Sequence, residues 1–159
     1  MAATAKLPRV RSVLVTTDFS PLSLRAIPHA CGLLPGGGRL HLVHVLHPLA
    51  LPGGRFVQGA WNYADRTAHG RLAARCAAKL RSLVPASARR RGLRVQTTVL
   101  EHEQPARAIN EEAARVAADA ICLATHGRTG VGAVVLGSVA QDVVASAHRP
   151  LFLVKQADD

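Results

Sequence analysis

Five short apolar runs alternate along the chain with segments of helical character, and this alternation constrains the fold more than any other feature. The run at residues 120–124 is continuously apolar, which is typical of a strand buried on both faces of a parallel sheet. Strands that alternate with helices predict an α/β fold with an open, doubly wound, five-stranded parallel sheet and four helices, Rossmann-like in architecture. We expect strands at residues 13–17, 40–46, 93–100, 120–124 and 151–155.

Prolines mark the starts of two expected helices. Ser20 suits a helix cap and Pro21 the first helical position, and Pro105 opens a later helix. Pro28 lies inside the first helix, where it removes an internal hydrogen bond, so we expect a kink there. The next helix has one apolar stripe, made of Leu72, Cys76, Leu80 and Leu83. The expected helices are at residues 22–34, 65–84, 105–117 and 137–147, with a short basic helical segment before the third strand.

The length of 159 residues suits one domain, and we expect a single domain over residues 1–159 with its core at residues 12–155. No window approaches the roughly 18 apolar residues of a membrane-spanning helix, and the first twelve residues lack the apolar stretch of a secretory signal. The three cysteines are widely spaced, unlike those of a disulfide framework or a paired metal site. These features predict a cytoplasmic protein with no membrane partner.

The formal net charge is +10, which raises the question of a nucleic-acid partner. Nucleic-acid recognition needs a clustered basic face, and single strands also need aromatic stacking platforms. The chain has three Phe, one Trp and one Tyr, none of which alternates with Arg or Lys. The densest basic cluster, Arg89, Arg90, Arg91 and Arg94, suits a solvated helix end. We therefore expect general attraction of anions, no specific nucleic-acid partner, and weak DNA binding that disappears as salt rises to physiological levels.

A glycine-containing loop, residues 124–138, follows the fourth expected strand and leads into the last helix. Doubly wound sheets bind their ligands outside the carboxyl ends of the strands, where this loop would lie. Glycines let the backbone approach a phosphate, amides at a helix start attract anions, and Ser138 adds a hydroxyl. The alternative is an ordinary turn, because the loop has neither the GxxxxGK[ST] nor the GxGxxG pattern.

Three matches, in order along the chain, resemble the universal stress protein family. Gly127 is followed after nine residues by Gly137 and Ser138, as in the family's nucleotide motif G-x2-G-x9-G-[ST]. Asp18 in the TTDFS segment and the LVHV segment at residues 42–45 also match. The resemblance covers nearly the whole chain and implies an adenine nucleotide α-hydrolase-like domain that forms homodimers.

The ATP-binding branch of this family implies ATP, with Mg held through the phosphates. Adenine would lie against the first and second strands, with Val45 meeting it through its backbone, and the glycine-containing loop would hold the phosphates. Ala124 stands where the motif has its first glycine and adds a methyl group near the ribose, and Glu103 replaces a glycine common after the third strand. Carried over by position, the nucleotide-binding residues are Thr16, Thr17, Asp18, Val45, Ala124, His126, Gly127, Arg128, Gly137, Ser138 and Val139.

Some polar residues have simpler explanations. Asp18 also suits a cap of the adjacent helix, and His126 suits loop packing because no Ser, Cys or carboxylate is placed beside it to complete a nucleophilic set. His41, His44 and His47 recur at every third residue, but a strand points successive residues to opposite faces. We therefore expect no metal site there, no catalytic residue, and a core role for His44 with a satisfied hydrogen bond.

These observations predict a nucleotide-binding regulatory protein of the stress response, in which ATP occupancy changes binding of an unidentified protein partner. The alternative is the family's other branch, a dimeric interaction protein that binds no nucleotide. A dedicated hydrolase is not expected, because such enzymes usually carry an SGG-type phosphate loop where this chain has residues 17–20. Slow ATP hydrolysis or autophosphorylation is compatible with the resemblance. The last expected strand is short, apolar and terminal, which favours a homodimer through the sheet edge.

Overall fold

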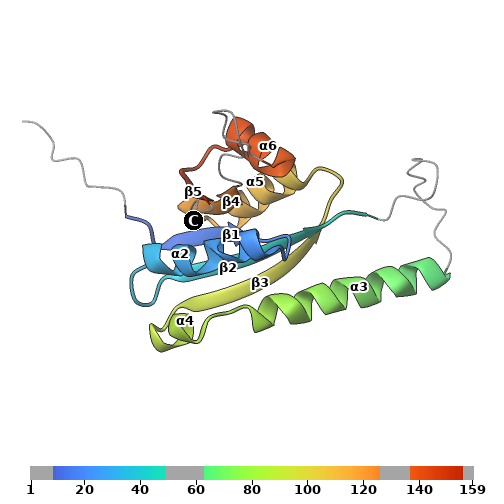
Figure 1. The fold of residues 1–159 in the computed structure, drawn as a ribbon, viewed down its shortest axis with the longest axis horizontal. Coiled ribbons are helices and arrows are strands. Elements are labelled where there is room, and N and C mark those ends of the chain that lie inside the picture. The colour runs from blue at the N-terminus through green and yellow to red at the C-terminus, as the bar shows by residue number, and fades with distance from the viewer. Residues whose placement is uncertain (1–8, 49–62, 126–136, 156–159) are drawn as a thin grey trace, which may run out of the picture.

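The computed structural model describes residues 9–48, 63–125 and 137–155, which form a sheet of five parallel strands in the order β3-β2-β1-β4-β5 (Figure 1). The expected strands are confirmed, and no strand end is displaced by more than one residue. The strands are β1 (Ser12–Thr16), β2 (Arg39–Leu46), β3 (Arg94–Glu101), β4 (Ala120–Thr125) and β5 (Leu151–Lys155).

Helices cover both faces of this sheet, as a doubly wound fold requires. One face packs against α2, α3 and α4, and the other against α5 and α6. None of the helices in the described ranges is long and apolar enough to cross a membrane. The helices are α1 (Pro21–Leu24), α2 (Ala26–Leu33), α3 (Tyr63–Ser82), α4 (Ala86–Arg90), α5 (Pro105–Arg115) and α6 (Ser138–Ser146).

Two buried cores lie on opposite faces of the sheet because successive strand side chains alternate between them. Val13 and Val15 belong to the core beneath α2, whereas Leu14 between them belongs to the core beneath α5 and α6. In β4, Cys122 and Ile121 divide in the same way. Because helices cover both faces, these strands need apolar side chains at every position, which explains the continuous apolar run at residues 120–124.

The first predicted helix is divided in two, and the interruption lies where the predicted effect of Pro28 would fall. The break falls at Arg25, between α1 and α2. Pro28 is the third residue of α2, which begins at Ala26. Pro28 has no amide hydrogen for the carbonyl of Leu24, which lies four residues before it at the end of α1, so the break falls where a proline removes a helical hydrogen bond.

The inward stripe of α3 differs in part from the predicted one. Leu80 is fully buried, and Cys76 and Leu83 are half-buried, as expected. Leu72, however, is 39% exposed, whereas His69 is 8% exposed. Residues 69, 73, 76 and 80 follow the i, i+4, i+7, i+11 spacing of one helix face, and Leu72 lies at its margin. Histidine is not an apolar residue, so the apolar pattern omitted His69 and placed Leu72 on the inward face instead.

Candidate functional site

A cavity of about 290 Å³ lies at the carboxyl ends of β1, β2 and β4. β1 and β4 are neighbours although β2 and β3 come between them in the sequence, so the strand order reverses at this point. Such a reversal is where doubly wound sheets bind their ligands. Every predicted site residue in the described ranges lines this cavity: Thr16, Thr17, Asp18, Val45, Ala124, Gly137, Ser138 and Val139. His126, Gly127 and Arg128 lie outside the described residues.

Thr17 anchors the turn that leaves β1 at the cavity. Its amide donates a hydrogen bond to the Val43 carbonyl at 3.0 Å, and its hydroxyl lies 2.8 Å from that of Ser23 in α1. The same hydroxyl accepts the Phe19 amide at 2.9 Å. Phe19 has a φ of 67°, a left-handed conformation that is rare for a large side chain. Hydrogen bonds on both sides of Thr17 therefore hold an unusual turn in place.

Asp18 is the one carboxylate among the described residues that line the cavity, and its side chain is exposed there. Ser20 is the helix cap, because its hydroxyl accepts the Ser23 amide at 3.2 Å, so the alternative role of Asp18 as the cap is wrong. Asp18 instead accepts the Ser20 amide at 2.9 Å. Partial burial opposes ionisation of Asp18, but hydrogen bonds from Ser20 and Ser23 outweigh it and lower the pKa of this carboxyl. The cavity therefore has a negatively charged rim at neutral pH.

His44, in β2, lines the same cavity and was not predicted to do so. Its Nδ1 donates a hydrogen bond to the Thr17 carbonyl at 2.8 Å, which confirms the expected satisfied hydrogen bond. The ring centroids of His44 and Phe19 are 4.3 Å apart. The Lys79 ammonium lies over the Phe19 ring, 4.6 Å from its centroid. His44 thus links β2 to the turn after β1. His41 is buried in the described structure and is 7% exposed.

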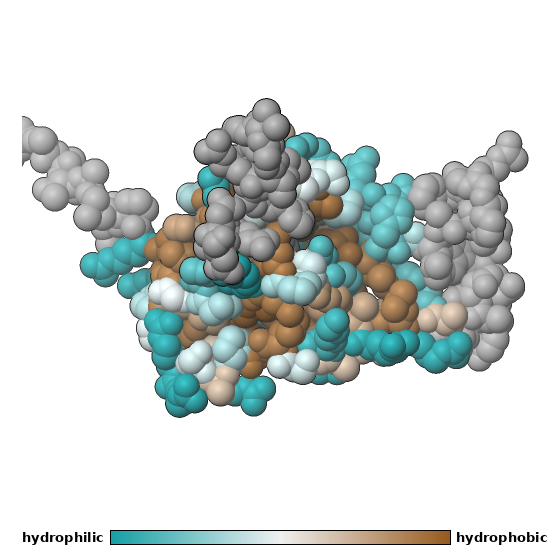
Figure 2. All heavy atoms as spheres, viewed as in Figure 1, coloured by the Kyte–Doolittle hydropathy of each residue, from teal (hydrophilic) through white to brown (hydrophobic). Residues whose placement is uncertain are grey.

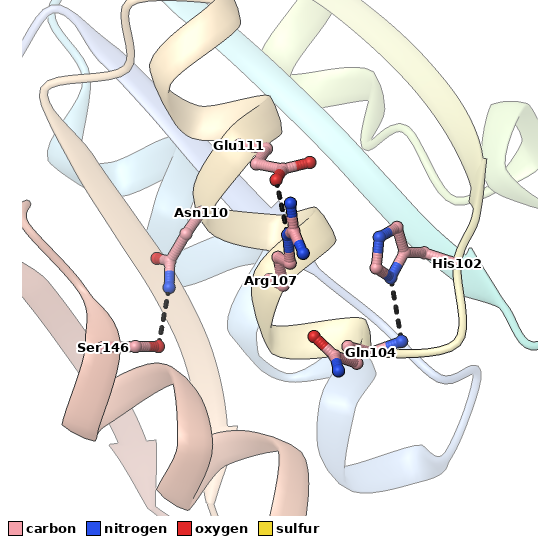
Figure 3. Close-up of polar contacts among 6 residues, drawn as sticks. All are labelled: His102, Gln104, Arg107, Asn110, Glu111 and Ser146. Atoms are coloured by element: carbon pink, nitrogen blue, oxygen red, sulfur yellow. Dashed lines mark hydrogen bonds and ion pairs between the residues drawn. The ribbon is translucent and has the colours of Figure 1, made fainter.

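Helices α5 and α6 form another wall of the cavity, through Pro105, Ile109 and Ala140. Figure 3 shows how the two helices are joined outside it: the Asn110 amide donates a hydrogen bond to the Ser146 hydroxyl at 2.9 Å. The remaining polar contacts in that view lie on α5 and the turn before it. They are an exposed Arg107–Glu111 ion pair at 2.7 Å and a hydrogen bond of 2.8 Å that the backbone amide of Gln104 donates to His102 Nδ1.

The N-terminus of α6 faces the cavity through Gly137, Ser138 and Val139. Gly137 is the N-cap, with φ −58° and ψ 152° and no side-chain capping bond. The first amides of a helix have no partner within it and attract anions. A Cβ built on Gly137 would have no described atom within 4 Å, and its φ is accessible to any residue. A side chain at this position would therefore enter ligand space without a clash with the described backbone.

The remaining cavity residues come from positions that the family motif does not mark. Ser20 and Pro105 were visible only as helix-start residues, and Leu123 only as an apolar strand residue. Nothing in the sequence placed Pro105 or Ile109 at the cavity, because the position of α5 there depends on the packing of the whole sheet. The residues added by the structure are Ser20, Leu22, Ser23, His44, Pro105, Ile109, Leu123 and Ala140.

The fold is that of the doubly wound α/β proteins, and the cavity lies where the strand order reverses, which is where proteins of this class bind their ligands. A sequence profile of the universal stress protein family matches residues 9–155. The chain belongs to the universal stress protein family. It is 30% identical over 152 residues to the universal stress protein MJ0531 of Methanocaldococcus jannaschii, with 92% of this chain and 82% of that protein covered.

Solved structures of the same fold include two complexes with adenine nucleotides. A universal stress protein in complex with cAMP is 18% identical, with a TM-score of 0.62, and the match covers 94% of this chain and 100% of that one. The universal stress protein from Archaeoglobus fulgidus in complex with dAMP is 21% identical, with a TM-score of 0.53, and the match covers 91% of this chain and 97% of that one. At these identities the likeness shows the fold.

Proposed function

We propose that this protein binds ATP in the cavity at the carboxyl ends of β1, β2 and β4, and acts in the stress response as a nucleotide-dependent regulatory protein. One observation carries the proposal. The predicted residues from the end of β1, the end of β2, the end of β4 and the start of α6 are distant in the sequence, yet they line one cavity. The cAMP and dAMP complexes of proteins with this fold support an adenine nucleotide as the ligand.

The residues around the cavity suit the parts of such a ligand. Apolar side chains such as Val45, Ile109 and Leu123 provide the surface that a purine base needs. The ionised Asp18 carboxylate accepts hydrogen bonds, which suits ribose hydroxyls. The first amides of α6 and the Ser138 hydroxyl suit phosphate oxygens. Bound Mg would neutralise phosphate charge and would be held through the phosphates.

Ala124 is the departure from the family motif that this proposal has to accommodate. It lies half-buried in β4 and lines the cavity beside Leu123. Its methyl group therefore takes space that a glycine leaves to the ligand. We expect Ala124→Gly to bind ATP more tightly than the wild-type protein.

We assign no catalytic reaction as the main function, although slow ATP hydrolysis or autophosphorylation fits the proposal. The protein responds to nucleotide through its surface: occupancy of the cavity alters the segments around it and so the binding of a protein partner. We place this activity in the cytoplasm. The alternative, an interaction protein of the same family that binds no nucleotide, predicts no effect of ATP on any property of the protein.

We further propose that β5 joins two copies of the chain into a homodimer. β5 lies at the end of the sheet, where it pairs with β4, and Leu153 on it is 39% exposed. Edge strands of this kind favour pairing with another strand. Light scattering at tens of micromolar should give twice the chain mass for the wild-type protein and the chain mass for Leu153→Lys. A dimer that survives this substitution contradicts the proposal.

A thermal unfolding series with Mg-ATP tests the nucleotide proposal. At about a hundred times its dissociation constant, a ligand stabilises a protein by roughly 2.7 kcal/mol, which raises the midpoint of a domain of this size by roughly 5 to 10 °C. Gly137→Val should remove this shift by filling phosphate space, and Ser138→Ala should only reduce it, since a hydrogen bond to a charged group contributes about 1.5 to 3 kcal/mol.

Gly32→Val is the matched control for the same series. Gly32 is an exposed residue of α2 with no described atom within 4 Å of a built Cβ, and it does not line the cavity. It should keep the full shift with ATP. If the wild-type protein shows no shift with ATP, ADP or AMP and releases no nucleotide on heating, the interaction-protein alternative replaces this proposal.

A further inference from the structure

Five exposed arginines gather at the end of the sheet opposite the cavity, where β1, β2 and β3 begin. Arg39 and Arg94 are the first residues of β2 and β3 and are direct partners in the register of the two strands. Arg11 precedes β1, and its carbonyl accepts the Arg39 amide at 2.8 Å. Arg89 and Arg90 end α4, just before β3, where Figure 2 shows hydrophilic residues at the lower left. We call Arg11, Arg39, Arg89, Arg90 and Arg94 the arginine edge; all five are exposed.

The arginine edge has no charge partners within the described ranges. The ion pairs of the described structure join His69 to Glu101, Arg107 to Glu111 and Arg115 to Glu112. Two carboxylates of this region are already engaged: Asp119 accepts the backbone amides of Arg11 and Ser12 at 2.8 and 2.9 Å, and Glu112 binds Arg115 at 2.6 Å. Neighbouring strands are about 4.8 Å apart, and the register places the backbones of Arg39 and Arg94 side by side.

Arg91, in the same region, differs from the arginine edge because its side chain has a structural role. Its guanidinium donates to the Cys31 carbonyl at 2.7 Å and also to the Leu34 carbonyl, so it closes the end of α2. The guanidinium groups of the arginine edge make no such hydrogen bonds to described residues. Their charge is therefore available to a ligand from outside.

We propose that the arginine edge binds the phosphate backbone of nucleic acid without regard to base sequence. Guanidinium groups bind phosphate through paired hydrogen bonds, and several of them at one end of the sheet, from two adjacent strands and from α4, suit a polymer that carries phosphates at short, regular intervals. Base readout needs aromatic platforms or side chains in a groove. The described aromatic side chains lie elsewhere, with Phe19 at the cavity end of β1 and Phe152 in β5. The surface therefore offers charge without a means to read bases.

An acidic protein is the competing partner for this surface, and the distribution of apolar side chains argues against it. Protein interfaces derive most of their affinity from buried aromatic or aliphatic anchors. The large apolar side chains exposed in the described structure are Leu72, Val139, Val144 and Leu153, which lie on α3, α6 and β5. None belongs to the arginine edge. A phosphate polymer needs only cations, and those are what this surface provides.

Fluorescence anisotropy with a labelled 20-base-pair DNA duplex, titrated at 50 and 200 mM NaCl, tests the proposal. Five phosphate contacts predict an affinity loss of about 500-fold between these salt concentrations. The double variant Arg39→Gln with Arg94→Gln retains three contacts, so its loss should be only about 40-fold, and its binding at 50 mM should be at least about tenfold weaker. A second duplex of unrelated sequence should give the same values.

The double variant Arg71→Gln with Arg75→Gln is the matched control, because both residues are exposed on α3 and the change in net charge is the same. It should keep the wild-type salt dependence. Equal weakening by both double variants would mean attraction by net charge alone and would overturn the proposal. So would an absence of binding at 50 mM NaCl, a tenfold preference between the two duplexes, or polyglutamate binding as tight as DNA with the same dependence on Arg39 and Arg94. The thermal midpoints of both variants, measured in parallel, should stay at the wild-type value.

Discussion

The two ends of the sheet are built from the same strands but present opposite kinds of surface. At the carboxyl ends, hydroxyls, apolar side chains, one carboxylate and the start of α6 line a cavity of about 290 Å³. At the other end, the arginine edge lies open to solvent. A concave, mostly uncharged site suits a small ligand, whereas an exposed group of cations suits a polyanion. The comparison separates two proposed binding sites that a net charge of +10 does not distinguish.

Ile121→Ala should destabilise the fold that supports both ends of the sheet. Ile121 is fully buried in the middle of the fold, in the core between the sheet and α5 and α6. Truncation of a buried isoleucine to alanine destabilises a protein by about 2 to 5 kcal/mol through lost burial and a residual cavity. Chemical denaturation should show this loss of stability. A loss under about 1 kcal/mol would mean that the two ends do not depend on this shared core.

Arg91→Ala tests whether Arg91, unlike the arginine edge, contributes to the stability of the fold. Loss of its guanidinium leaves two carbonyls at the end of α2 without their charged donor, and we expect a loss of about 2 kcal/mol in unfolding free energy. Both arginines are exposed, but the Arg90 guanidinium makes no hydrogen bond to a described residue, so Arg90→Ala is the control and should change stability by less than about 0.5 kcal/mol. Equal effects of the two substitutions in denaturant titrations would remove the distinction between Arg91 and the arginine edge.

His41 should make the fold sensitive to acid without involving the cavity. Burial lowers the pKa of His41 below 6.5, and the nearby charges of Arg39 and Arg115 add to the shift, while Glu112 and the Gln96 side chain oppose it. The folded protein therefore holds His41 neutral, and the unfolded chain takes up a proton first as pH falls through about 6.5. The stability that neutral His41 supplies is present above pH 6.5 and decreases as the pH falls below it.

Unfolding free energies measured between pH 7 and pH 5 should thus fall with pH, and His41→Gln should make the decrease smaller. His29→Gln, which replaces an exposed histidine of α2, is the control substitution. Asp18 acts in a lower pH range than His41. The pKa of its carboxyl is lowered in the folded state, so ionised Asp18 adds stability that is lost only as the pH falls below about 4. A pH dependence that is the same in wild type and His41→Gln would contradict this role of His41.

The sequence was sufficient for the strands, because a parallel sheet covered on both faces requires apolar runs that local composition reveals. It was less informative where tertiary contacts decide. The interruption before Pro28 could be predicted, because the effect of a proline on a helix is local, but α3 turned His69 inward in place of Leu72. Local patterns could not predict this orientation of α3, because it depends on how the helix meets the sheet.

The site shows the same division between local and tertiary information. Gly137 and Ser138 were found by motif spacing and Asp18 by its TTDFS segment, and the structure places all three around one cavity. Pro105 and Ile109 were missed, since they reach the cavity only through the packing of α5 beside the sheet. Arg89 and Arg90 were correctly predicted to end an exposed helix, but the sequence does not show that Arg39 and Arg94 are register partners beside them.

An NMR titration of the ¹⁵N-labelled protein with Mg-ATP compares the two ends in one experiment. If ATP binds in the cavity, the amide signals of Thr17, Val45 and Ser138 shift and saturate, while those of Arg39 and Arg94 remain in place. This is the result we predict at physiological salt, where exposed charges more than about 8 to 10 Å apart are screened from each other. Shifts confined to Arg39 and Arg94, or no saturable shift at Thr17, Val45 and Ser138, would contradict the assignment of the nucleotide to the cavity.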